Sequence, residues 1–266
     1  MKNTITTLCV VTTIIIWTAT GMASCKKSNN NNNSTGTFYF HIHTDIDTNE
    51  VGDTTALYRD SSGRHFVLSV AQFYITSIKL HNVTGTYYTI PNAIVLKNID
   101  SERYLIGQAP AGTYDGVTFT VGLDAMTNAK TPSSFTNNGY IPNSAMWFGT
   151  TTDGYMYLNL QGFADTTAAQ TGNNLVHFSY QLGKFFAVGG GDRDLKTVTM
   201  PTRTGVYQPY ILFAGSTSYI HLICDYGKLL NGVNFKTQDS IDTHAGLNNA
   251  ASIIAGNIPN MFHYEE

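Results

Sequence analysis

Apolar and polar positions alternate strictly where the first ordered part of the chain is expected. In residues 37–43, positions 38, 40 and 42 are Phe, Phe and Ile, and the positions between and after them include His41 and His43. Successive side chains of a β-strand point to opposite faces, so this pattern indicates a half-buried strand. The apolar set is expected to face a core, and both histidines are expected to lie on the opposite face.

Many other segments of the chain also have the length and pattern of strands. Strands are predicted at residues 66–80, 94–98, 116–123, 155–160, 175–182, 195–200 and 218–224. Helix is expected only in short pieces, at residues 225–230 and 249–255, and residues 127–144 form a long Thr/Asn-rich loop. Many short strands separated by polar turns are typical of a sandwich. We therefore predict one all-β domain over residues 37–266, an antiparallel β-sandwich with short helical turns near the C-terminus.

The first 24 residues have the order of a bacterial lipoprotein signal peptide. Lys2 is positive, residues 8–16 are mostly apolar, and small residues precede Cys25. The apolar run is too short to span a bilayer. These features predict cleavage after residue 24 and lipidation of Cys25, which anchors the protein in a membrane. Residues 25–36 are polar and Asn-rich, so they are expected to form a flexible tether. The predicted location is the cell envelope, periplasmic or at the outer-membrane surface.

Charge and cysteine content exclude several classes of function. The chain has 15 Lys and Arg against 18 Asp and Glu, a net charge of −3, which is not the basic footprint of a nucleic-acid-binding protein. Of the three cysteines, Cys9 lies in the signal peptide and Cys25 is the predicted lipid site. Cys224 then has no partner for an intrachain disulfide, and its alternation with apolar neighbours predicts a buried, inert thiol.

The motifs of common enzymes are absent from the sequence. It contains no G-x-S-x-G elbow, P-loop, H-E-x-x-H or C-x-x-C, and it is not expected to be an enzyme. The sharpest local signal is the pair His41 and His43, whose Cα atoms on a strand would lie about 7 Å apart on one face. Imidazole is a ligand for copper and zinc, so this pair is a candidate metal site. The alternative is two solvated histidines opposite the apolar face.

Several segments resemble the methanobactin-associated copper-binding protein family (MbnP-like). Residues 67–80 are similar to its "FYISNIKL" strand, and the family's later segments have counterparts in the same order at residues 110–124, 146–147, 154–162, 195–198, 225–232 and 254–262. The resemblance implies a periplasmic or surface β-protein that binds copper. It also implies a di-haem peroxidase-type partner that oxidises a tryptophan to kynurenine near the copper; Trp147 is the matching residue.

Two positions depart from the family pattern. Residues 150–152 are threonines where the family often has a second tryptophan, and Gln181 stands where it often has histidine. These departures concern the metal site and leave the expected fold unchanged. From the family resemblance and the histidine pair together, we expect copper binding or trafficking at the cell envelope, with copper held by His41 and His43. A third ligand is sought in an oxidised Trp147 or in a histidine such as His177. The alternative function is a metal-free envelope binding or adhesion module that contacts a glycan or a protein.

Overall fold

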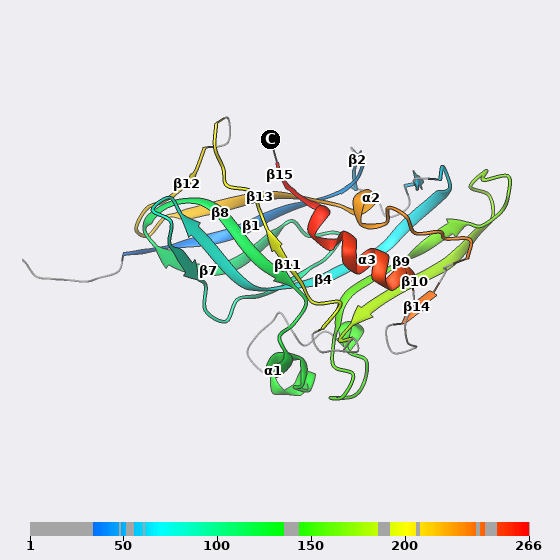
Figure 1. The fold of residues 1–266 in the computed structure, drawn as a ribbon, viewed down its shortest axis with the longest axis horizontal. Coiled ribbons are helices and arrows are strands. Elements are labelled where there is room, and N and C mark those ends of the chain that lie inside the picture. Colours follow the sequence, from blue (N-terminus) through cyan, green and yellow to red (C-terminus); the bar gives the residue numbers. More distant parts are fainter. Residues whose placement is uncertain are drawn as a thin grey trace, which may run out of the picture. The chain divides into compact units, whose positions relative to one another are not determined.

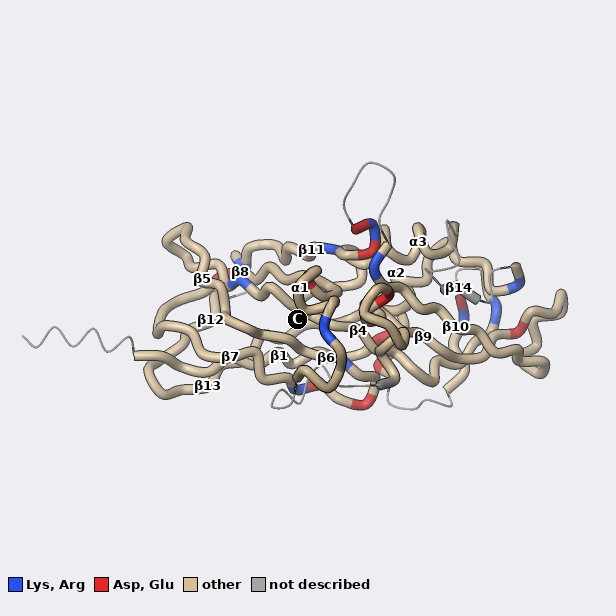
Figure 2. The backbone as a smooth tube through the Cα atoms, turned by 90° about the horizontal axis from the view of Figure 1, so that it is seen from below, with Lys and Arg blue, Asp and Glu red and all other residues tan. Residues whose placement is uncertain are grey.

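The structure is a computed structural model that describes residues 34–47, 49–51, 56–60, 62–135, 144–185, 192–205, 208–237, 240–242 and 249–265. The predicted signal peptide, Cys25 and most of the predicted tether lie outside the described residues. Charged residues are thinly spread along the backbone, and long stretches of the tube contain none (Figure 2).

One sheet has five strands, and it carries the face on which the predicted histidine pair lies. Its strands are β1 (Thr35–Ile46), β2 (Asn49–Glu50), β7 (Arg103–Pro110), β13 (Thr217–Asp225) and β15 (Phe262–Tyr264). The order is β15-β13-β1-β2. The strand β7 also pairs with β1, along a different part of that strand from β2. The central pair β1 and β13 is parallel and runs side by side in Figure 1, whereas the other pairings of this sheet are antiparallel.

The second sheet has ten strands and is built around the long strand β4 (His65–Asn82). Its main path also contains β8 (Gly112–Val121), β9 (Met156–Asp165), β10 (Leu175–Gly183), β11 (Lys196–Thr199) and β14 (Ser240–Asp242). Short strands complete it at β3 (Tyr58–Arg59), β5 (Tyr87–Thr89), β6 (Ile94–Lys97) and β12 (Tyr210–Leu212). All of its pairings are antiparallel except the parallel pair β10–β14.

The hydrophobic core lies between the two sheets. Phe40 of β1 makes an edge contact with Phe119 of β8, with ring centroids 5.7 Å apart. Phe262 of β15 contacts both Phe119 and Phe73 of β4, at 5.0 and 5.7 Å. These aromatic contacts join the inner faces of the sheets, and the prediction of an all-β sandwich is confirmed.

Helices are few and short, as the sequence predicted. They are α1 (Ala125–Asn128), α2 (Tyr226–Leu229) and α3 (Asn249–Asn257), with single 3₁₀ turns at Pro132–Ser134, Ser144–Met146 and Ile258–Asn260. Asp124 caps α1 and Asp225 caps α2, because each carboxylate accepts hydrogen bonds from backbone N–H groups of the first turn. Within the described residues, every helix is too short or too polar to cross a bilayer.

All eight predicted strands are present, with small shifts at their ends. The first begins at Thr35 rather than at residue 37, and alternate residues along its whole length are buried. Cys224 is fully buried in β13, and burial raises the pKa of its thiol to about 12, as expected for an inert cysteine.

Candidate metal centre

His41 and His43 lie on the outer face of β1, opposite the core. Their side chains are 16% and 19% exposed, while Phe40 and Ile42 between and beside them are fully buried. The two rings meet edge to face, with centroids 4.5 Å apart. The period-2 pattern that places Phe40 and Ile42 in the core therefore also places both imidazoles on one surface.

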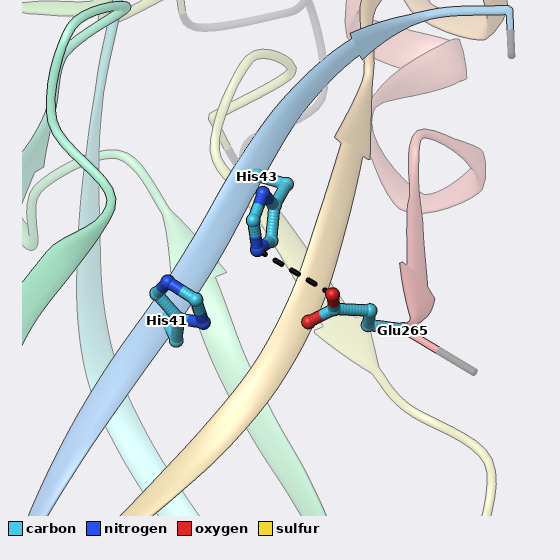
Figure 3. Close-up of side chains that lie close together, drawn as sticks. All are labelled: His41, His43 and Glu265. Atoms are coloured by element: carbon cyan, nitrogen blue, oxygen red, sulfur yellow. Dashed lines mark ion pairs between the residues drawn. The ribbon is translucent and has the colours of Figure 1, made fainter. Parts of the chain in front are cut away.

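Strand pairing brings a third histidine to the same place. The parallel register sets His41 directly opposite His221 of β13, and their Nδ1 atoms are 3.0 Å apart. Glu265 follows β15, and its Oε2 lies 3.0 Å from the same Nδ1 atom of His221. Glu265 also points toward His43, with Oε1 at 3.5 Å from Nε2 (Figure 3).

Two more carboxylates approach the histidines from the other side. Oε2 of Glu102 lies 3.1 Å from Nε2 of His41, and Oε1 of Glu50 lies 3.2 Å from Nδ1 of His43. Glu102 stands at the start of β7, where its backbone carbonyl accepts a hydrogen bond from Ile42, and Glu50 pairs with Asp45 across β1 and β2. We call the residues His41, His43, His221, Glu50, Glu102 and Glu265 the histidine cluster. It contains every glutamate among the described residues.

With neutral imidazoles, the histidine cluster has more lone pairs than hydrogens. A neutral imidazole carries one N–H donor and one acceptor nitrogen. Because Nε2 of His41 donates to Glu102, its Nδ1 is left with a lone pair, which meets Nδ1 of His221. Oε2 of Glu265 approaches that same nitrogen of His221, which can offer at most one hydrogen.

His43 shows the same imbalance. Its Nδ1 donates to Glu50, so Nε2 carries a lone pair; this atom is buried and has no hydrogen-bond partner among the described residues, although Glu265 lies nearby. Unpaired buried acceptors are costly, and a cation placed among them would satisfy them together.

Three residues of the histidine cluster have donor atoms close enough to share one metal ion. Two atoms that bind a tetrahedral ion at about 2.0 Å lie roughly 3.3 Å apart; His221 lies 3.0 Å from both His41 and Glu265, and His43 lies 3.5 Å from Glu265. His41, His43 and Glu265 each offer a ligand atom within 4.8 Å of the others. The carboxylate of Glu102 on the far nitrogen of His41 is the usual partner of a metal-ligating histidine.

Further charges surround the histidine cluster. Partial burial and the nearby carboxylates of Asp225 and Glu50 raise the pKa of Asp45, while His43 and His263 act in the opposite direction. His263 lies in β15 opposite Ile223 and shares the outer face of the sheet with Glu265. Four of the histidines in the described part of the chain therefore lie on this one face.

A buried lysine supports the segment that carries Glu102. Nζ of Lys97 is enclosed at the end of β6 and donates to Oγ1 of Thr44 at 2.7 Å and to the carbonyls of Asn98 and Ser101 at 2.5 and 3.0 Å. Thr44 lies in β1 next to His43, so the ammonium joins the strand of the histidines to the turn before Glu102. Burial lowers the pKa of Lys97 to about 8.

Trp147 and His177, which the sequence suggested as third ligands, lie elsewhere. Trp147 packs on Tyr155, with ring centroids 4.6 Å apart, in a second apolar cluster with Tyr74 and Met146. His177 is exposed on β10 beside Phe163. His221 was not predicted as a ligand from the sequence. A signal for it existed, because Tyr39-x-His41 and Tyr219-x-His221 have the same spacing. The parallel register sets these two segments side by side.

Comparisons with known proteins agree with the resemblance seen in the sequence. No curated protein matches the chain. A solved structure, MbnP from Methylosinus trichosporium, is similar with 15% sequence identity and a TM-score of 0.48, over 62% of this chain and 71% of that one. The family model for MbnP matches residues 35–247, which contain both sheets' central strands and five of the six residues of the histidine cluster. The chain therefore belongs to the MbnP family.

Proposed function

We propose that this protein binds copper at the cell envelope and serves copper storage or transfer there. The ion is held by His41, His43 and His221 with the carboxylate of Glu265. The observation that carries the proposal is the convergence of these side chains from β1, β13 and the residue after β15, with more lone pairs than hydrogens among neutral imidazoles. Imidazole-rich sites favour copper, which stands at the top of the affinity order of divalent first-row metals. Lipidation of Cys25 would hold this site near a membrane.

The residues around the ion have separate tasks in this proposal. Glu102 fixes the ring of His41 through Nε2, so that Nδ1 faces the ion. His43 is oriented by Glu50 and presents Nε2 to the same space. Bound copper supplies the positive charge that pairs with these donors. Protons compete with metal for the imidazoles, so copper affinity is expected to fall as the solution is acidified.

The test is a copper titration of the metal-free mature domain, with a competing chelator of known affinity. The double variant His41→Ala, His43→Ala and the single variant His221→Ala should each lose affinity by more than the roughly 10- to 100-fold typical of lost orienting partners. His177→Ala is the matched control, because that histidine is exposed and lies on the other sheet. Far-ultraviolet circular dichroism checks that all variants keep the strand-rich fold.

The outcomes separate the two functions considered. Equal affinity in wild type and the double variant would remove this cluster as the copper site. Absence of copper binding by the wild type would instead favour a metal-free binding or adhesion module.

A further inference from the structure

The imidazole of His43 faces acidic groups on both sides of its ring. Nε2 lies toward Glu265, at 3.5 Å from Oε1. Nδ1 lies toward Glu50 and Glu102, at 3.2 and 3.8 Å from their Oε1 atoms. A histidine that only ligates one ion needs a single acceptor for its other nitrogen, yet Nδ1 of His43 has two carboxylates around it.

The two sides form two separate sets of ligand atoms. His41, His43 and Glu265 supply one set, and His43, Glu50 and Glu102 supply the other; within each set the atoms lie within 4.8 Å of one another. His43 is the only residue common to both. Since its two nitrogens point away from each other across the ring, each set uses its own nitrogen.

The second set places two carboxylates around one nitrogen. Nδ1 carries at most one hydrogen, so His43 can donate to only one of Glu50 and Glu102. Glu50 is 62% exposed and Glu102 is 45% exposed, so an ion can reach them from solvent. Glu102 also links the sets, because its other oxygen is hydrogen-bonded to Nε2 of His41.

We propose that the histidine cluster holds two metal ions, one on each side of the His43 ring, with the imidazole of His43 bridging them. This rests on the proposed copper site, which takes the histidine-rich side. The second position offers one nitrogen and two carboxylate oxygens, a donor set that suits Zn²⁺. When both nitrogens are bound, the ring gives its remaining N–H proton to the solvent. The three glutamates then offset the charge of two ions rather than one.

The test starts from mature protein loaded with one equivalent of Cu²⁺, to which Zn²⁺ is added. Calorimetry should record one equivalent of bound zinc with copper retained. The electron paramagnetic resonance spectrum of Cu²⁺ should change on zinc addition, because the second ion alters the shared imidazole. Glu50→Gln should abolish zinc binding. Copper should stay bound, with its affinity lowered by no more than the roughly 10- to 100-fold typical of a lost orienting partner, because Glu50 orients His43 from the Nδ1 side. Asp153→Asn, which removes a carboxylate that accepts a hydrogen bond from Thr150 in its own turn, is the control and should behave as wild type.

Failure of this inference is distinct from failure of the proposed function. A wild-type protein that binds no copper overturns the copper site itself. Copper binding with no uptake of zinc, or with zinc displacing copper, overturns the second position and leaves Glu50 and Glu102 as orienting groups. If zinc uptake persists in Glu50→Gln, or if it leaves the copper spectrum unchanged, the zinc binds elsewhere. Either result also overturns the second metal position.

Discussion

The buried ammonium of Lys97 should make the free energy of unfolding rise as the pH is raised above about 8. Lys97 is fully buried, and burial lowers its pKa from 10.5 to about 8. The unfolded chain therefore keeps the proton up to about pH 10.5, whereas the folded chain releases it near pH 8. Stability rises with pH wherever the unfolded state binds more protons. The gain is absent below pH 8 and complete above the unfolded pKa.

The size of the effect follows from the shift. One pKa unit corresponds to about 1.4 kcal/mol, so the full shift is worth about 3 kcal/mol, of which about 2 kcal/mol appears between about pH 7.5 and pH 10. Cys224 acts in the opposite direction over the same range, because its folded pKa is raised to about 12 and the unfolded thiol ionises first. The useful quantity is therefore the difference between wild type and Lys97→Met, both of which keep Cys224.

The assay is urea denaturation of wild type and Lys97→Met at both pH values, in metal-free buffer. Lys97→Met is itself expected to change stability at neutral pH, because the carbonyls of Asn98 and Ser101 lose a donor. The prediction concerns only the pH dependence: wild type should gain about 2 kcal/mol relative to the variant between the two conditions. A stability difference that stays constant with pH would show that Lys97 does not titrate in this range and would contradict the prediction.

Three further outcomes are expected. The thiol of Cys224 should react with a disulfide reagent only after denaturation, since it is fully buried and its pKa is raised; rapid reaction of the folded protein would contradict this. Trp147→Phe should keep copper affinity within a few-fold in the same titration, because Trp147 packs on Tyr155 outside the histidine cluster, and a large loss would return this tryptophan to the copper site. Cys25→Ala should release the protein from the membrane fraction on cell fractionation, and continued membrane retention with a cleaved signal peptide would exclude lipidation as the anchor.

Local periodicity was sufficient to predict the strands that form the core. The alternation around Phe40 identified β1 and the face of its histidines, because one face of a half-buried strand must be apolar. Strands without such alternation were missed. In β7, Gly107 has a positive φ of 136° and Pro110 ends the strand, so the segment lacks the pattern of a regular strand. In β15, three residues are too few to show a period.

The rest of the histidine cluster could not be predicted because it depends on strand pairing. His41 and His221 are 180 positions apart in the chain, and no local pattern states which strands become neighbours. The same holds for Glu102, which reaches the site through β7, and for Glu265, which reaches it through β15. Even the prediction of an antiparallel sandwich pointed away from the central contact, since β1 and β13 are parallel.

The core determines on which face of that parallel pair the histidines lie. Ile220 and Leu222 of β13 are buried opposite Phe40 and Ile42 of β1, so both strands present their apolar sets to the same side. A shift of one residue would turn Ile220 outward and bury His221, because side chains alternate along a strand. Burying an imidazole without a partner and exposing a large apolar side chain are both unfavourable. The apolar positions that hold the sheets together therefore also place His41 and His221 on the same outer face.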